Sequence, residues 1–146
     1  MDKNILYETA KILIEKIENA KDKEEIWLTY HDLSMYLKRY AGISIEPLFT
    51  KNYIGELSTI CYRMGLPLIS CIVINKEDLI PGSGFFKLYG ELTGRKLKKE
   101  ELDRIWLDES EKCLRCKDWD KLLLAVNPNH QVKLKTHKIK PLNIKK

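Results

Sequence analysis

Four cysteines and three histidines are the residues in this sequence whose types could support nucleophilic or metal chemistry. The Ser70-Cys71 pair lies in an apolar run, Cys61 falls at an apolar position, and Cys113 and Cys116 form a CxxC motif. A nucleophilic cysteine must ionise, which requires a neighbouring cationic group. Because isoleucine and valine follow Cys71 directly, the sequence favours a thiol that packs in the core, and it predicts no catalytic residue.

The CxxC motif is followed by His130 and His137, with six residues between the two histidines. Histidines of zinc fingers usually lie about three to five residues apart, and there is no second CxxC. The spacing therefore favours a helical CxxC with one side in the core, and it predicts no metal and no cofactor. Disulfides are not expected in a cytosolic chain.

Other catalytic signatures are missing from the sequence. It has no Walker loop, dinucleotide fingerprint, Ser-His-Asp order or HExxH. The acidic pairs Glu100-Glu101 and Asp108-Glu109 lie among many other charges and are interpreted as a solvated helix face. The expectation is a protein that is not an enzyme.

Charge is divided unevenly along the 146 residues. Residues 1–120 hold all 21 acids and 19 of the 26 basic residues, a net charge of −2, whereas residues 121–146 hold seven lysines and no acid. Six of these lysines lie in 131–146, and a basic tail of this kind is either a solvated end or an arm that binds phosphates. Alternation at 132–136 suggests that the tail begins as an edge strand.

Hydropathy points to a protein outside the membrane. No apolar run approaches the roughly 20 residues that cross a bilayer, and the N-terminus lacks the features of a secretory signal. A cytoplasmic location and no membrane partner are therefore expected.

Apolar residues recur at helical spacing in several segments, with Thr29 as a candidate N-cap and Gly42, Gly65 and Gly94 as helix ends. Helices are expected over 3–19, 30–41, 51–64, 85–93 and 97–116. The β-branched run 68–75 predicts a buried strand.

The loop Pro81–Gly84 precedes a predicted helix and has two readings. Gly82 and Gly84 could adopt positive φ to make a tight turn, or the loop could present backbone N–H groups to an anion or nucleotide. The candidate residues for the second reading are Asn75, Lys76, Ser83, Gly84 and Lys87.

Several short motifs together resemble a small domain found alone, or in front of an HNH nuclease module, in bacteria and their phages. The matching residues are Thr29-Tyr30, Ile54-Gly55, Cys61, Gly65-Leu66-Pro67-Leu68, Val73-Ile74-Asn75-Lys76, Pro81-Gly82-Ser83-Gly84-Phe85 and, towards the end, Asp118-Trp119. The match covers roughly residues 28–90.

The same segments are more distantly similar to the winged-helix domain of alkylguanine DNA alkyltransferases and alkyltransferase-like proteins. In that comparison Ser70, not Cys71, takes the place of the nucleophile, and the arginine that fills the gap left by a flipped base has no counterpart in 48–53. The resemblance implies a winged helix that binds DNA without alkyl transfer.

In a winged helix of this kind, helix 51–64 would enter the major groove, and its outward residues would contact bases and phosphates. A plain solvated helix face is the alternative. The candidate DNA-binding residues are Tyr30, Lys51, Asn52, Thr59 and Arg63, with Lys133, Lys135, Lys138 and Lys140 in the tail.

The sequence as a whole predicts an α+β fold, winged-helix-like, with an extra N-terminal helix and a C-terminal helical extension. Residues 1–130 would form one domain and 131–146 the basic tail. The predicted function is non-enzymatic binding of duplex DNA, linked to restriction or phage defence. The alternative is a small phage or defence protein that binds a protein partner or a nucleotide. Oligomeric state is left open.

Overall fold

The computed structural model describes residues 1–129. Its α-helices are α1 (Lys3–Glu18), α2 (Tyr30–Ala41), α3 (Thr50–Arg63), α4 (Ser83–Thr93), α5 (Leu102–Arg115) and α6 (Trp119–Val126). Short 3₁₀ helices and strands connect them: η1 (Lys23–Ile26), β1 (Leu28–Thr29), η2 (Pro47–Phe49), η3 (Ile69–Ile72), β2 (Val73–Ile74) and η4 (Lys99–Glu101). The predicted tail, 131–146, lies outside the described residues, as does its predicted edge strand.

Local sequence signals explain where the helices begin and end. The Asp2 carboxylate accepts hydrogen bonds from the N–H groups of Asn4 and Ile5 and so begins α1. Thr29 and Asp32 form a capping box at the start of α2, which ends at Gly42 with φ of 67°. The helices expected over 3–19, 30–41, 51–64 and 85–93 are confirmed to within two residues, and 97–116 divides into η4 and α5.

The strand expected over 68–75 is mostly wrong. Its first part forms η3, and only Val73 and Ile74 are extended. They pair in parallel with β1, so that Leu28 lies opposite Val73 and Thr29 opposite Ile74. β-branched composition marked this segment as buried, which it is, but burial alone does not determine whether the backbone is helical or extended.

The described residues are therefore mostly helical, with a two-stranded parallel sheet, which is compatible with the α+β class. In this part of the chain η2 connects α2 to α3, and the sheet lies beside α2. The winged-helix assignment stays a prediction.

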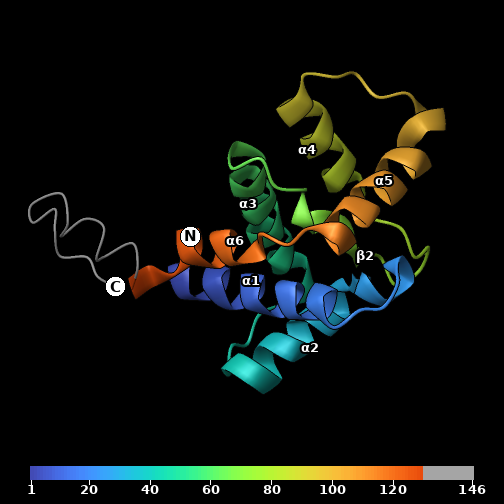
Figure 1. Cartoon of the computed structure of the whole chain (residues 1–146). Coiled ribbons are helices and arrows are strands. Elements are labelled where there is room, and N and C mark those ends of the chain that lie inside the picture. The colour runs from blue at the N-terminus through green and yellow to red at the C-terminus, as the bar shows by residue number, and fades with distance from the viewer. Residues whose placement is uncertain (130–146) are drawn as a thin grey trace, which may run out of the picture.

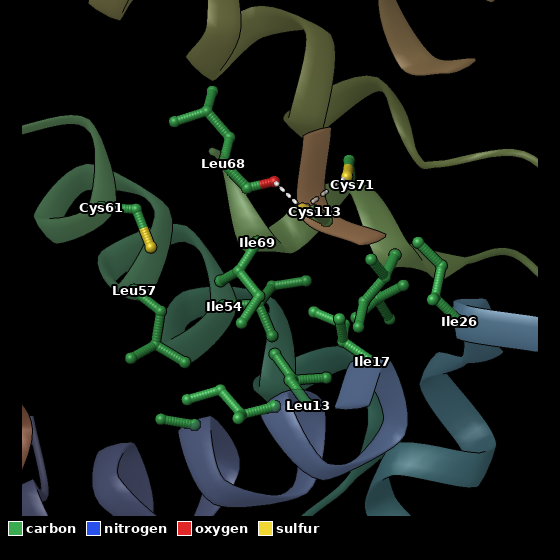
Figure 2. Packing of buried hydrophobic residues seen from close by; sticks show 14 of the residues in the cluster. Leu13, Ile17, Ile26, Ile54, Leu57, Cys61, Leu68, Ile69, Cys71 and Cys113 are labelled. Carbon is green, nitrogen blue, oxygen red and sulfur yellow. Dashed lines mark hydrogen bonds between the residues drawn. The ribbon is translucent and has the colours of Figure 1, made fainter. Parts of the chain in front are cut away.

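A single cluster of buried apolar side chains joins the elements from α1 to α6. Figure 1 shows α1 and α6 running side by side, with α2 on the other side of α1. Figure 2 shows Leu13 and Ile17 of α1 pointing towards Ile54 and Leu57 of α3, with Ile69 of η3 beside Ile54. This core fixes α3 and the chain that follows it, and these segments carry most of the candidate site residues.

Two glycines in helices provide a test of the packing around α4. A Cβ atom at Gly90 would lie 2.9 Å from the backbone oxygen of Arg95, whereas one at Gly55 in α3 would have no neighbour within 4 Å. We expect Gly90→Ala to lower the free energy of unfolding by about 1–3 kcal/mol. The matched Gly55→Ala should raise it by about 0.5–1 kcal/mol, because alanine is the better helix former. Urea denaturation measures both, and equal effects would contradict the close packing at Gly90.

Candidate anion-binding site

Three polar side chains from separate elements meet around Gly82, immediately before α4. A Cβ atom built on Gly82 would lie 3.3 Å from Tyr30 Oη, 3.8 Å from Lys51 Nζ and 3.9 Å from Asn75 Nδ2. Tyr30 begins α2, Lys51 lies in the first turn of α3, and Asn75 directly follows β2. We name Tyr30, Lys51, Asn75 and Gly82 the Gly82 cluster. All three side chains can donate hydrogen bonds, and one of them is a cation.

The tyrosine in this cluster stays neutral in the physiological range. Burial raises the pKa of the Tyr30 hydroxyl, and a hydrogen bond with the backbone of Gly82 lowers it by a smaller amount. Lys51 Nζ lies 5.1 Å from the centre of the Tyr30 ring, so the ring also attracts the ammonium group. A neutral phenol keeps its proton and can donate it to an anion beside Lys51.

The N-terminus of α4 adds backbone donors to the Gly82 cluster. No side chain caps this helix at Gly82, and Ser83 and Gly84 in its first turn are exposed. The first N–H groups of an α-helix have no partner within the helix and carry a partial positive charge. An anion seated at this terminus would therefore meet both the backbone N–H groups and the side chains of the cluster.

The positive φ angles expected at Gly82 and Gly84 for a tight turn are wrong. Gly82 has φ of −66°, and the described residues with positive φ do not include Gly84. The left-handed residue is Leu79, at φ of 59°, in a turn where its N–H donates to the oxygen of Asn75 at 2.9 Å. A Cβ atom at Gly82 would crowd Tyr30 Oη at 3.3 Å, which is a tertiary contact that the local sequence does not reveal.

The structure thus joins two groups of residues that the sequence placed in separate sites. Tyr30 and Lys51 were candidates for DNA contacts, and Asn75, Ser83 and Gly84 were candidates for an anion loop. They converge because the parallel pairing of β1 with β2 brings the start of α2 next to the loop that follows β2. Lys76 and Lys87 are exposed, and no described contact joins them to the cluster.

The remaining candidates on α3 lie along its outer side. Asn52 and Arg63 are exposed, while Thr59 is half-buried and donates to the backbone oxygen of Gly55 at 3.0 Å. Asn52 also lines an open groove of about 670 Å³ between α2 and η2, together with His31 and Lys38. The tail candidates Lys133, Lys135, Lys138 and Lys140 lie outside residues 1–129.

Ser70 and Cys71, the residues nearest to the position of a nucleophile, are buried. Ser70 Oγ lies 2.6 Å from Ser58 Oγ, which also accepts the Ser70 N–H at 2.9 Å. Cys71 is fully buried, with its sulfur 3.6 Å from that of Cys113, and Figure 2 shows both in the core. The predicted packing role of Cys71 is confirmed, although it lies in η3 and not on a strand. The absence of enzymatic activity stays a prediction.

Burial also disfavours ionisation of the neighbouring thiols. It raises the pKa of Cys61 to about 12, raises that of Cys113 well above its ordinary value, and raises that of the half-buried Cys116. A thiol must lose its proton to act as a nucleophile or metal ligand. Within residues 1–129 no group of histidine, cysteine and carboxylate side chains could hold a metal ion. His130 and His137 lie outside this part.

The raised pKa of Cys61 predicts a loss of stability in alkali. Between about pH 9 and pH 12 the unfolded chain releases the thiol proton while the folded chain keeps it. The free energy of unfolding should therefore fall by up to about 1.4 kcal/mol per pH unit from this residue. Urea denaturation at pH 8 and pH 10 should show a smaller fall for Cys61→Ala than for Cys116→Ala, because the pKa of the half-buried Cys116 is raised less. An unchanged fall in Cys61→Ala would contradict the prediction.

Comparison with protein-family models, curated proteins and solved structures found no match for this chain. Among residues 1–129, no helix has both the length and the apolar character needed to cross a lipid bilayer.

Proposed function

We propose that this chain is a non-enzymatic nucleic-acid-binding protein that holds a backbone phosphate of duplex DNA in the Gly82 cluster. The observation that carries the proposal is the convergence of Tyr30, Lys51 and Asn75 on the uncapped N-terminus of α4. A phosphate oxygen accepts hydrogen bonds from every one of these groups. Phosphate contacts fix the register and orientation of a protein on a duplex, and they supply much of its affinity.

The outer side of α3 is the part that would face the bases. Lys51 and Asn52 are consecutive in its first turn, so a phosphate held by Lys51 brings Asn52 to the edge of the same groove. Asparagine can pair with adenine and arginine with guanine, which gives Asn52 and Arg63 the chemistry for reading sequence. In this proposal α2, η2 and α3 act as the helix-turn-helix of a winged-helix-like unit, and the basic tail adds further phosphate contacts. The resemblance of residues 28–90 is the basis for proposing a link to restriction or phage defence.

A pair of glycine variants tests this site without changing any charge. We expect Gly82→Ala to weaken binding of duplex DNA by about tenfold, because the new methyl group pushes Tyr30 Oη aside and fills the place of a phosphate oxygen. Gly84→Ala is the matched comparison: its Cβ would have no neighbour within 4 Å and its backbone N–H is kept, so binding should weaken clearly less than in Gly82→Ala. Fluorescence anisotropy of a labelled duplex measures the affinities.

Equal affinities in the two variants would remove the Gly82 cluster from the interface. Thermal denaturation of each variant shows whether its fold is intact, and the φ of −66° at Gly82 is one that alanine readily adopts.

Exposed apolar side chains favour a second candidate, the binding of a protein partner. Leu48 and Phe49 in η2 are 71% and 59% exposed, and Phe49 lines the same groove as Met35, which is 39% exposed. Contiguous exposed apolar patches are typical of surfaces that bind proteins. Association with a protein through this surface would tolerate salt, whereas DNA binding should weaken steeply as salt rises.

A further inference from the structure

A pocket of about 340 Å³ lies on a different surface, between the end of α3, the turn that follows it, α4 and α5. Its lining includes the aromatic side chains Tyr62 and Tyr89 and the carboxylate of Glu109. None of these residues belongs to the Gly82 cluster or to the candidate DNA-binding residues. The volume is at the lower end of the range for sites that bind small ligands or single side chains.

Glu109 is the unusual feature of this pocket. The sequence interpretation of Asp108-Glu109 as a solvated face is wrong for Glu109, which is only 6% exposed, although Asp108 is exposed. The inward residues Ile105, Glu109 and Cys113 recur at every fourth position of α5, and this spacing could have revealed its burial. A carboxylate this deeply buried needs partners for both of its oxygens.

The two carboxylate oxygens of Glu109 differ in their hydrogen bonds. Oε2 accepts a hydrogen bond of 2.6 Å from the N–H of Leu68, which fixes the orientation of the carboxylate. The nearest cation to Oε1 in the described part of the chain is Lys112 Nζ at 3.7 Å, too far for a hydrogen bond, on a side chain that is 64% exposed. Oε1 is therefore a preorganised acceptor whose ion pair with Lys112 is loose.

We propose that this pocket binds a guanidinium group, as carried by the arginine side chain of a peptide or protein partner. Oε1 of Glu109 accepts N–H donors from the guanidinium, while Tyr62 offers a ring face to its planar cation. The ring of Tyr89 already contacts the guanidinium of Arg95, at 5.9 Å from the ring centre, and forms the other aromatic wall. Arginine suits the site better than lysine because its flat, weakly hydrated head combines hydrogen bonding with stacking, whereas an ammonium keeps its water. The proposal does not depend on DNA binding.

Removing the charge of Lys112 is expected to strengthen binding of the guanidinium, not to weaken it. Its ammonium group competes with the ligand for Oε1, so Lys112→Gln should strengthen binding of the guanidinium by a few-fold. Glu109→Gln should abolish binding, because the amide that replaces the carboxylate can still accept the Leu68 N–H but carries no charge. A role for Glu109 in folding alone predicts neither change in affinity.

The experiment is a titration of the full chain with Nα-acetyl-arginine amide, followed by NMR of the amide groups at Leu68 and Glu109. The uncharged isostere Nα-acetyl-citrulline amide serves as the matched probe. Saturable shifts with the arginine probe, none with citrulline, tighter binding in Lys112→Gln and loss in Glu109→Gln would support the proposal. Equal shifts with both probes, or the same affinity in wild type and Lys112→Gln, would overturn it.

A surface variant covers the case in which Glu109→Gln does not fold. Tyr62 is 44% exposed, so Tyr62→Leu removes the ring face with little effect on the core. We expect this variant to bind the arginine probe about three- to tenfold more weakly, the value of a cation–π contact. Unchanged affinity in Tyr62→Leu would contradict the role of the aromatic walls and, with it, the assignment to a guanidinium.

Discussion

Replacing Lys51 by glutamine is expected to weaken the binding of duplex DNA by about tenfold or more. Lys51 is the only full charge in the Gly82 cluster, and a hydrogen bond between charged groups contributes about 1.5–3 kcal/mol. The slope of log affinity against log salt should also become shallower by about 0.9, because one fewer counterion is released from the DNA. Anisotropy measured at several salt concentrations gives both quantities.

Lys121→Gln is the matched control for this experiment. It removes the same charge from an exposed position on α6, the helix that packs against α1. Its affinity and salt slope should stay near those of the wild type. If the two variants lose affinity equally, DNA responds only to net charge, and the proposed phosphate site is wrong.

Truncation of Trp119 should have the largest effect on stability. The side chain is 1% exposed, and its Nε1 donates to the backbone oxygen of Cys113 at 3.3 Å. Trp119→Ala should lower the free energy of unfolding by about 3–5 kcal/mol through the cavity that it leaves. Because α6 packs against α1 (Figure 1), this loss of stability would come from packing between these two helices and not from the candidate sites.

Two further variants separate the loss of buried volume from the loss of the hydrogen bond and from the loss of an exposed side chain. Trp119→Phe keeps most of the volume but removes the hydrogen-bond donor, and should cost about 1–3 kcal/mol. Leu124→Ala on the same helix removes a side chain that is 54% exposed, and should cost less than about 0.5 kcal/mol. Similar losses in Trp119→Ala and Leu124→Ala, measured by urea denaturation, would show that α6 is not packed as described.

The helices could be predicted from the sequence because their signals are local. Thr29, Gly42 and Gly94 mark helix ends through the chemistry of their own positions, and the structure uses each as expected. The run 68–75 was misjudged because its extended or helical state depends on tertiary packing. Trp106 donates to the backbone oxygen of Cys71 at 2.9 Å, across 35 residues, and no local pattern encodes that bond.

The candidate site could be predicted only in parts. Lys51 and Asn75 were recognisable as polar residues at the start of a helix and the end of an apolar segment. The meeting of Asn75 with Tyr30 depends on the pairing of β1 with β2, two strands of two residues each, which are too short to show any alternation. Glu109 was missed for a different reason. Its charge led to the interpretation of an exposed residue, although its position in the helical pattern of α5 indicated burial.

The central claim is that the Gly82 cluster and the N-terminus of α4 together form one phosphate site. NMR of the full chain, titrated with inorganic phosphate, tests it most directly through the backbone amides of Ser83 and Gly84, with sodium chloride at equal ionic strength as the control. The claim predicts saturable shifts of these amides with phosphate only, and their loss in Lys51→Gln. Identical shifts with chloride, or shifts that persist unchanged in Lys51→Gln, would contradict it.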